Sequence, residues 1–328
     1  MKIFVSRKIP GDHIEKLKIT GNDVVVSEFN RALTQAELVE RVKGADAILS
    51  LLTDRIDGDL VDAAGPQLKI VSNYAVGFDN IDVKALTDRG IVVTNTPCDE
   101  VNESVAEHTW ALMLALTRRI IEADEATRKG GYKGWEPDIF LGSNVIGKTL
   151  GIVGLGRIGS MVARRAMGYN MTVLYNKREP DPKAEQELGV KFVSLDDLYK
   201  QSDFVSIHVP LTEETRHMVN MSSFEKMKKG AFLVNTARGP VVDERDLVEA
   251  IRTGMLGGAA LDVFDNEPNI SPELLNEPNV ITTPHIASAT WEARNKMGDM
   301  AVESILSVLR DQKPESIVNE DVWPKRRV

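Results

Sequence analysis

The sequence predicts an α/β protein built from two doubly wound parallel sheets. Strand and helix signals alternate over the first hundred residues, and they alternate again from Val145 to Thr283. In the second region a glycine-rich turn stands between a short apolar run and a helical pattern. Alternating strands and helices give a parallel sheet with helices on both faces. A chain of 328 residues is long enough for two such cores.

The first region contains five strand signals with helices between them. We expect strands at Lys2–Ser6, Asp23–Ser27, Ala47–Leu52, Leu68–Ser72 and Ile91–Thr94. We expect helices over Thr34–Lys43, Asp57–Ala64 and Asp82–Arg89. The first of these helices opens on a capping box formed by Thr34 and Glu37, and Gly90 closes the third as its C-terminal cap.

A strongly apolar helix is expected next, within Asn102–Arg119. Ser104 and Glu107 have the spacing of a second capping box. Because the helix is apolar on most of its circumference and too short to cross a bilayer, we expect it to connect domains or to lie at a subunit interface. The Gly, Trp and Pro residues of Gly130–Pro137 then indicate an exposed loop.

The second region repeats the alternation over a longer stretch. We expect strands at Thr149–Gly154, Thr172–Tyr175, Phe204–Val209, Ala231–Thr236, Gly258–Val263 and Val280–Thr283. We expect helices over Ile158–Met167, Ser222–Lys228 and Glu244–Arg252. After Ser288 the pattern is helical through Val308, and the tail from Gln312 to Val328 is irregular.

The glycine-rich turn reads Gly154-Leu155-Gly156-Arg157-Ile158-Gly159 and has the G-x-G-x-x-G spacing. The first glycine permits a tight turn, the second lets the backbone approach a pyrophosphate, and the third lets the helix pack closely on the strand. The N-terminus of the helix offers unpaired N–H groups to phosphates. The strand and helix on either side favour dinucleotide binding over a simple tight turn.

Three residues with suitable chemistry follow strand ends of the second region: Arg238, Glu267 and His285. An arginine binds a carboxylate through two hydrogen bonds, and a histidine can transfer a proton to oxygen. A neighbouring carboxylate favours the charged form of an imidazole. Together with a nicotinamide, these groups suit hydride transfer to a 2-oxo acid. Each could instead be an ordinary turn, loop or packed residue, and His208 at the same edge is the alternative histidine.

The turn after the second strand of this region suggests which cofactor is used. A site for NAD usually carries a carboxylate there, which bonds the ribose 2′-OH. Here the strand ends in Asn176, Lys177 and Arg178, with no carboxylate before Glu179. Because basic groups suit a 2′-phosphate, the sequence favours NADP(H) and leaves NAD(H) open. The alternative is a solvated basic turn.

Composition excludes several other classes of protein. The net charge is −9 and the pI is near 5.3, without a Lys/Arg block, so nucleic acid is not an expected partner. The lone Cys98 excludes an internal disulfide framework and fits a reducing compartment. The residues after Met1 form no apolar leader, and no segment has membrane-spanning length. We expect a cytoplasmic protein without a metal site.

Motifs along the whole chain carry a resemblance to a known family. They lie at Val5–Pro10, Asn73–Asp82, Thr94–Pro97, Gly154–Gly159, Val209–Thr212, Asn235–Gly239, Leu261–Phe264, Glu267–Pro268 and Thr283–Ile286. In them the chain resembles the D-isomer-specific 2-hydroxyacid dehydrogenases, and within these the glyoxylate/hydroxypyruvate reductases. The resemblance implies a Rossmann cofactor domain, residues 101–287, inserted into a flavodoxin-like substrate domain formed by residues 1–100 and 288–328.

The resemblance also implies roles for individual residues. Arg238 would orient the substrate, His285 would donate the proton, and Glu267 would be the partner of His285. Implied cofactor contacts are Gly154, Leu155, Gly156, Arg157, Ile158, Gly159, Asn176, Lys177, Arg178, Pro210, Thr236, Ala237, Asp262 and Ala287. Implied substrate contacts, besides Arg238, are Leu52, Val76, Gly77, Ser288 and Trp135. Because Trp135 matches a tryptophan that reaches into the partner subunit's site in relatives, a homodimer is implied. The alternative is that Trp135 packs locally and anchors its own loop.

The expected reaction is reduction of glyoxylate or hydroxypyruvate with NADPH, giving glycolate or D-glycerate. The segment Cys98–Glu107 departs from this expectation, because it resembles the phosphoglycerate dehydrogenase type. A D-3-phosphoglycerate dehydrogenase, or another D-2-hydroxyacid dehydrogenase that uses NADH, is therefore the alternative within the family. The alternative outside enzymes is a nicotinamide-sensing binding protein, similar to the transcriptional corepressors that share this fold.

Overall fold

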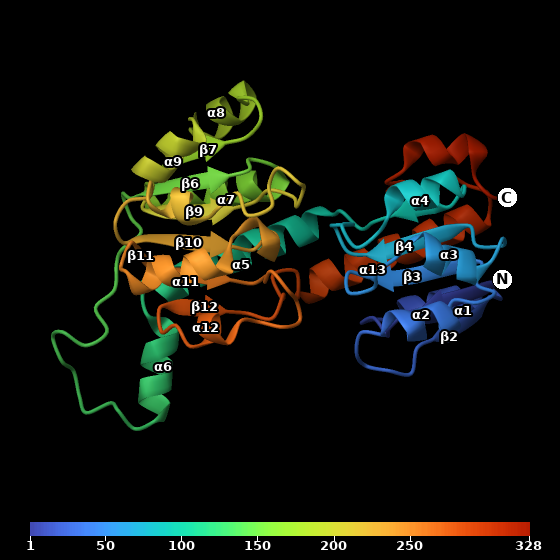
Figure 1. The fold of residues 1–328 in the computed structure, drawn as a ribbon, viewed down its shortest axis with the longest axis horizontal. Coiled ribbons are helices and arrows are strands. Elements are labelled where there is room, and N and C mark those ends of the chain that lie inside the picture. Colours follow the sequence, from blue (N-terminus) through green and yellow to red (C-terminus); the bar gives the residue numbers. More distant parts are fainter. The chain divides into compact units, whose positions relative to one another are not determined.

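The computed structural model describes residues 1–328, which divide into two compact units (Figure 1). Unit 1 comprises Met1–Val101 and Ala289–Val328, and unit 2 comprises Asn102–Ser288. The chain enters unit 2 within the first turn of helix α5 (Asp99–Thr117) and returns to unit 1 just before helix α13 (Trp291–Leu309).

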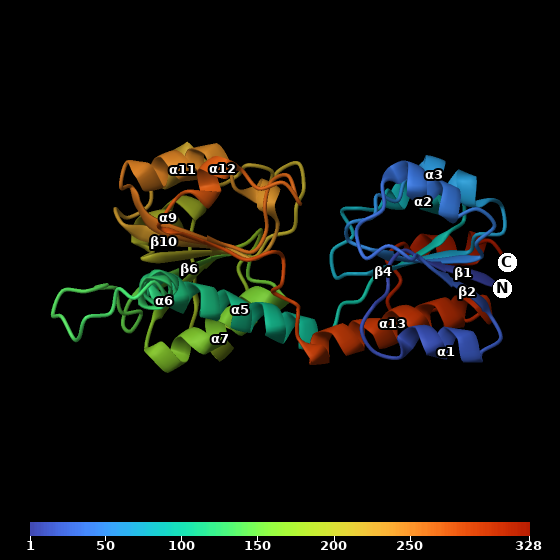
Figure 2. The same cartoon turned by 90° about the horizontal axis from the view of Figure 1, so that it is seen from below.

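Unit 1 is a parallel sheet with helices on both faces. Its strands are β1 (Lys2–Val5), β2 (Asp23–Val26), β3 (Ala47–Leu51), β4 (Ile70–Tyr74) and β5 (Val92–Thr94), in the order β2-β1-β3-β4-β5. This is the flavodoxin-like doubly wound order. The helices are α1 (His13–Ile19), α2 (Gln35–Arg41), α3 (Gly58–Ala64), α4 (Val83–Asp88) and α13. Figure 2 shows α2 and α3 on one face of the sheet and α1 and α13 on the other.

The helix ends of unit 1 follow the expected local chemistry. Thr34 accepts a hydrogen bond from the N–H of Glu37, and the Glu37 carboxylate accepts one from the N–H of Thr34. The predicted capping box is therefore confirmed. Gly90, with a φ of 71°, follows α4 in the left-handed conformation that favours glycine, and this end is confirmed as well.

Unit 2 contains seven parallel strands. They are β6 (Thr149–Val153), β7 (Thr172–Asn176), β8 (Lys191–Phe192), β9 (Phe204–Ile207), β10 (Ala231–Asn235), β11 (Leu256–Leu261) and β12 (Val280–Thr282). Their order is β12-β11-β10-β9-β6-β7-β8. The chain builds outward from β6 through β7 to β8, and then returns to place β9 on the other side of β6. The two sheets confirm the predicted fold class, and the end of β6 is the topological switch point where such sheets bind ligands.

Helices cover both faces of this second sheet. They are α5, α6 (Ile120–Arg128), α7 (Arg157–Ala166), α8 (Pro182–Leu188), α9 (Leu195–Gln201), α10 (Met221–Phe224), α11 (Glu244–Arg252) and α12 (Pro272–Leu275). Figure 2 shows α5 and α7 on one face and α9, α11 and α12 on the other. Each face has its own cluster of buried apolar side chains: one contains Trp110 and Val162, the other Leu198 and Leu247.

Helix α5 begins earlier than the sequence pattern predicted. It starts at Asp99, so Ser104 lies inside the helix and is buried, and the predicted capping box of Ser104 and Glu107 is wrong. The first turn instead carries Asp99 and Glu100, whose negative charge suits the N-terminal end of the helix dipole. No helix in the chain combines the length and the apolar character needed to cross a membrane.

Candidate active site

The three glycines of the turn after β6 have three different surroundings. Gly154 has a φ of 99°, and a Cβ there would lie 2.6 Å from the carbonyl oxygen of His208. A Cβ on Gly159 would lie 2.3 Å from the carbonyl oxygen of Gly154, so the close approach of α7 to β6 requires glycine. A Cβ on Gly156 would meet no atom within 4 Å. Open space therefore faces the second glycine, where a pyrophosphate would need it.

The N-terminus of helix α7 supplies free donors beside that open space. The first backbone N–H to donate within the helix is that of Ser160, which bonds the carbonyl oxygen of Gly156. The N–H groups from Arg157 to Gly159 have no acceptor in the chain. Leu155 is buried and anchors the turn, while the Arg157 side chain is exposed. The turn therefore has the geometry and the donors to hold the phosphates of a dinucleotide.

The basic turn after β7 is less open than its sequence suggests. The Asn176 amide donates to the carbonyl oxygen of Val193 over 2.9 Å, and Lys177 Nζ lies 3.1 Å from a carboxylate oxygen of Asp181. Arg178 is exposed and is not held in an ion pair. Of the three residues predicted to receive a 2′-phosphate, Arg178 is therefore the one whose positive charge is not already paired with a carboxylate.

His285 and Glu267 form a hydrogen-bonded pair past the ends of β12 and β11. Nδ1 of His285 lies 2.8 Å from Oε2 of Glu267. The other carboxylate oxygen of Glu267 accepts the backbone N–H of Phe264 over 3.0 Å, which fixes the orientation of the carboxylate. His285 has a φ of 54°, a left-handed conformation that is uncommon for a residue with a side chain. Both side chains remain partly exposed.

Arg238 follows β10 on the neighbouring turn. The side-chain amide of Asn235 donates to the carbonyl oxygen of Arg238, and its oxygen accepts the N–H of Ala237, so one side chain shapes the turn. The guanidinium donates to the carbonyl oxygen of Ala237 over 2.7 Å. Since β10, β11 and β12 are parallel neighbours, their carboxyl ends bring Arg238, Glu267 and His285 to one edge of the sheet.

Asp262 is a fully buried carboxylate that holds the turn carrying His285. It accepts the hydroxyl of Thr283 over 2.6 Å and the N–H groups of Ile286 and Ala287 over 2.9 and 2.8 Å. Burial alone would raise the pKa of Asp262. Hydrogen bonds from His108, Thr283 and the two backbone N–H groups outweigh burial and hold this pKa below its usual value.

His208, the alternative histidine, has the wrong environment for a proton donor. Its Nε2 lies 2.7 Å from the hydroxyl of Ser206. Burial lowers the pKa of His208 to about 4, so the imidazole is neutral at pH 7 and carries no spare proton. This observation favours His285 over His208 as the acid.

In unit 1, the loop after β4 is shaped by asparagine side chains. The amide of Asn95 donates to the carbonyl oxygen of Val76 over 2.7 Å, and that of Asn73 donates to the carbonyl oxygen of Gly77 over 3.0 Å. The backbone N–H groups of Val76 and Gly77 have no acceptor in the chain. This loop therefore presents two backbone donors at the carboxyl edge of the first sheet. Leu52, directly after β3, lies at the same edge and is partly exposed.

Comparison with known proteins identifies the family. The sequence profile described as D-isomer specific 2-hydroxyacid dehydrogenase, NAD binding domain, matches residues 110–287. The chain belongs to the D-isomer-specific 2-hydroxyacid dehydrogenases. It is similar to the glyoxylate reductase of Thermococcus kodakarensis, with 46% identity over 99% of this chain and 98% of that protein.

Solved structures extend the similarity to the whole fold. The TT0316 protein of Thermus thermophilus superposes with a TM-score of 0.91 at 43% identity, covering 97% of this chain and 100% of that one. An NADPH-dependent glyoxylate/hydroxypyruvate reductase of Sinorhizobium meliloti superposes with a TM-score of 0.84 at 32% identity, covering 99% of both chains. The resemblance predicted from the motifs is confirmed, and the protein is an NAD(P)-dependent oxidoreductase.

The remaining predicted contacts of the dehydrogenase lie on its turns and loops. Pro210 follows β9 and is exposed, Thr236 is buried after β10, and Ser288 is half-buried at the end of unit 2. Trp135 lies in the coil between α6 and β6 and is 83% exposed. Within unit 2, Trp135 is therefore not packed into the core.

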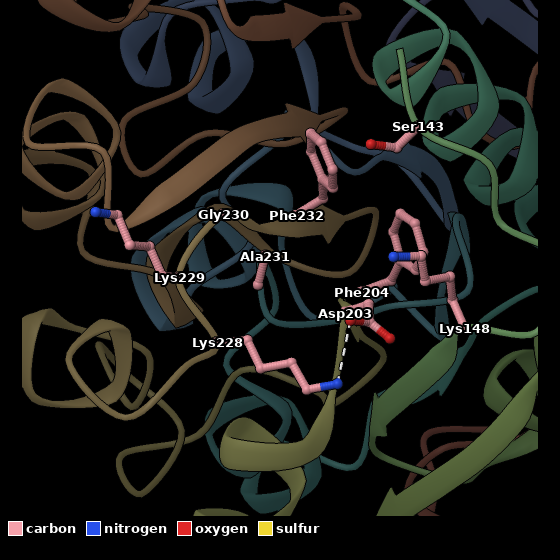
Figure 3. Close-up of a pocket in the computed structure, with 9 residues that line it drawn as sticks. All are labelled: Ser143, Lys148, Asp203, Phe204, Lys228, Lys229, Gly230, Ala231 and Phe232. Carbon is pink, nitrogen blue, oxygen red and sulfur yellow. Dashed lines mark hydrogen bonds and ion pairs between the residues drawn. The ribbon is translucent and has the colours of Figure 1, made fainter.

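A pocket of about 130 Å³ lies at the opposite edge of the second sheet (Figure 3). Its lining includes residues at the amino ends of β9 and β10. Asp203 inside it is already paired with Lys228 over 3.1 Å, and it accepts the N–H of Thr149. Because ligands of doubly wound sheets bind at the carboxyl edge, this pocket is separate from the turns that carry Arg238, Glu267 and His285.

Sequence reasoning missed two groups of residues around these turns. Asn73 and Asn95 shape the loop of unit 1, and His108 and Thr109 on α5 bond the turns of unit 2. The asparagines lie within recognised motifs but have no motif role of their own. The signal for His108 and Thr109 was their place directly before the long apolar run from Trp110 to Leu116 of the same helix.

Proposed function

We propose that this dehydrogenase reduces glyoxylate and hydroxypyruvate with NADPH, giving glycolate and D-glycerate, and that His285 is the proton donor. The observation that carries the proposal is the pair of His285 and Glu267 at 2.8 Å, on the sheet edge that also bears Arg238 and the glycine turn. The names of the relatives from Thermococcus and Sinorhizobium support the substrate and the cofactor.

The direction of proton transfer follows from the histidine pair. Nδ1 of His285 faces the Glu267 carboxylate, so Nδ1–H donates there and Nε2 is the nitrogen directed to substrate. The carboxylate stabilises the imidazolium and holds its orientation. As the carbonyl carbon C2 of the oxo acid accepts a hydride, Nε2–H protonates the developing alkoxide.

Binding of the oxo acid is assigned to Arg238 and to the loop of Val76 and Gly77. A guanidinium can bond a carboxylate and polarise the neighbouring carbonyl oxygen. The two unpaired N–H groups of the loop suit a carboxylate oxygen. Leu52 is assigned to the end of the substrate opposite its carboxylate, where an apolar side chain suits a small substrate.

The nicotinamide cofactor supplies the hydride when it is bound. Gly156 and the N–H groups at the start of α7 are assigned to its pyrophosphate. Arg178 is assigned to a 2′-phosphate, because its guanidinium is exposed and is not held in an ion pair. Lys177, which is held by Asp181, has a smaller part in this preference.

A second copy of the chain is the proposed partner. Large apolar side chains are exposed over α6 and the coil that follows it, among them Ile120, Ile121, Tyr132, Trp135, Leu141 and Ile146. Ile121, Leu141 and Leu275 line one groove of about 390 Å³. A cluster of exposed apolar side chains of this kind is typical of a protein–protein interface, so we assign this face to a homodimer.

Initial rates of the purified protein test the proposal. The substrates are glyoxylate, hydroxypyruvate and 3-phosphohydroxypyruvate, each with NADPH and with NADH. We expect the first two to turn over faster, and NADPH to be preferred. Preference for the phosphorylated acid with NADH would overturn both the substrate and the cofactor assignment. Tight cofactor binding without turnover of any acid would favour a nicotinamide-sensing binding protein.

A further inference from the structure

Two adjacent residues of helix α5 each bond a different strand-end turn of unit 2. Nε2 of His108 lies 3.1 Å from Oγ1 of Thr283, and Oγ1 of Thr109 lies 2.9 Å from Oγ1 of Thr236. Each bonded threonine stands two residues before one of the proposed functional side chains. One turn of a core helix therefore contacts both turns on which the reaction depends.

The direction of the His108 bond follows from the hydroxyl of Thr283. This hydroxyl donates its only hydrogen to Oδ1 of Asp262, over 2.6 Å. Its oxygen is then an acceptor toward His108, so Nε2 of His108 must carry a hydrogen. Nε2 also lies 3.5 Å from the same carboxylate oxygen. The chain of bonds runs from His108 through Thr283 to Asp262, whose carboxylate holds the two N–H groups that follow His285.

The same reasoning fixes the bond of Thr109. Its hydroxyl donates to the carbonyl oxygen of Val105, over 2.8 Å, so its oxygen accepts the hydroxyl hydrogen of Thr236. Both threonine side chains are buried. A buried hydroxyl without a hydrogen-bond partner destabilises the folded protein. The bond between Thr109 and Thr236 therefore holds the start of the Arg238 turn against the helix.

The backbone conformation of His285 depends on such supporting hydrogen bonds. A residue with a side chain persists in the left-handed region only when the surrounding structure holds it there. His285 has a φ of 54° and its imidazole contacts Glu267, so relaxation of the backbone after loss of the supporting bonds would let the imidazole move. Small displacements of a reacting group cost a large part of the rate.

We propose that His108 and Thr109 are positioning residues. Together, from one turn of helix α5, they hold the turns of His285 and Arg238 in position relative to each other. The inference rests on the proposed function, because it assigns the proton donor to His285 and substrate binding to Arg238. Neither positioning residue is assigned a contact with the oxo acid or the cofactor. Their effect is expected to pass through Thr283 and Thr236.

Matched pairs of variants test each half of the inference. His108→Leu replaces the donor with an apolar side chain of similar volume, whereas His108→Gln keeps a side-chain N–H. Thr109→Val removes the hydroxyl at constant shape, whereas Thr109→Ser keeps it. For every variant we would measure kcat, KM for the oxo acid, the Kd for NADPH and the midpoint of thermal unfolding. The oxo acid is whichever of the three the wild type reduces fastest.

The two halves predict different kinetic changes. His108→Leu lowers kcat about 10-fold and leaves KM and the Kd for NADPH within about twofold, because the proton donor alone is displaced. Thr109→Val raises KM as well, because the arginine that binds the carboxylate shifts. His108→Gln and Thr109→Ser keep kcat and KM close to the wild-type values. In hydrogen-exchange measurements, residues 283–287 exchange faster in His108→Leu than in His108→Gln.

Other outcomes overturn the inference. Equal losses of kcat in His108→Leu and His108→Gln would show that the hydrogen bond of His108 does not matter and that the shape of its side chain does. Wild-type kinetics and exchange in His108→Leu and Thr109→Val would show that the turns hold their geometry without helix α5. Because the fastest oxo acid is used, failure of the glyoxylate assignment is seen separately in the wild-type rates.

Discussion

Gly239 packs directly against the backbone of Phe264. A Cβ on Gly239 would lie 1.9 Å from both the carbonyl carbon and the carbonyl oxygen of Phe264. The glycine follows Arg238, and the N–H of Phe264 is bonded by the carboxylate of Glu267. The absence of one side chain thus allows the turn of Arg238, the proposed substrate-binding residue, to lie against the turn of Phe264 and Glu267.

Replacement of Gly239 by alanine tests this packing. Gly239→Ala should destabilise the protein by about 1–3 kcal/mol, because the backbone of one turn must move. It should also lower kcat by displacing Arg238 or Glu267. Gly168→Ala is the matched control, since a Cβ there meets no atom within 4 Å. Thermal unfolding and initial rates check both effects, and a Gly239→Ala protein that matches the control would contradict the packing argument.

Removal of the proposed proton donor should affect the chemical step. His285→Ala should lower kcat about 10²–10⁴-fold, the usual contribution of a positioned general acid. Glu267→Gln keeps the shape but removes the charge that stabilises the imidazolium, so its kcat should fall by a smaller factor. Cofactor binding, measured by fluorescence titration, should be unchanged in both variants. A kcat near that of the wild type in His285→Ala would remove the role assigned to this residue.

Arg178 should determine the preference between the two cofactors. Arg178→Ala should raise KM for NADPH about 10-fold or more, the effect of one lost hydrogen bond to a charged group, and leave KM for NADH nearly unchanged. Lys177→Ala is the internal comparison, and its smaller effect is expected because Lys177 is already paired with Asp181. Equal changes in KM for NADPH and for NADH would place Arg178 outside the 2′-phosphate site.

Asp262 should contribute stability that depends on pH. The pKa of Asp262 is lower in the folded state than in the unfolded state. Its contribution to the free energy of unfolding is therefore complete above the unfolded-state pKa, about 3.9. That contribution is lost as the pH falls through the folded-state pKa. Asp262→Asn should therefore reduce the free energy of unfolding by about 2 kcal/mol at pH 7. The difference from the wild type should shrink below about pH 4. Urea unfolding between pH 3 and pH 8 tests the sign, and a difference that grows in acid would refute it.

The exposed apolar face over α6 should hold two copies together. Leu141→Asp should give a monomer in light-scattering measurements, because a charge in the groove with Ile121 and Leu275 would be costly to bury. Ile19→Asp is the control: this side chain is 84% exposed on helix α1 of unit 1, outside that face. Dimers that persist in Leu141→Asp would place the interface elsewhere.

Long apolar runs and local helix signals were predictable from sequence. Every predicted strand is present with ends that differ by a few residues, and the helix over Glu244–Arg252 has the predicted bounds. These elements have clear periodicity or caps of their own. The short strand at Lys191–Phe192 and the helices over His13–Ile19 and Pro182–Leu188 were not predicted. Their few residues give a weak periodic signal, and tertiary packing decides their conformation.

Helix α5 shows where a local signal fails. Ser104 and Glu107 have capping-box spacing, but the helix starts five residues earlier, at Asp99, and the serine is buried inside it. A capping box stabilises an N-terminus only when the preceding backbone leaves the helix. Here Val101 and Asn102 before the serine are buried, and Asp99 and Glu100 suit the helix N-terminus, so the longer helix forms.

The sequence by itself determined the two parallel sheets, the glycine turn at the switch point, and the residues that follow each strand. These depend on local periodicity and on the chain order of the elements, which a single sequence carries. The tertiary structure decided which polar groups are already paired. The resemblance had implied the pair of His285 and Glu267, and the structure gives its distance. The structure alone paired Lys177 with Asp181, left Arg178 without an ion pair, and placed His108 against Thr283. The pair of Lys177 and Asp181 is a local one, four residues apart. The contact of His108 with Thr283 joins residues far apart in the chain, and it depends on how β12 and α5 pack, so no local pattern encodes it.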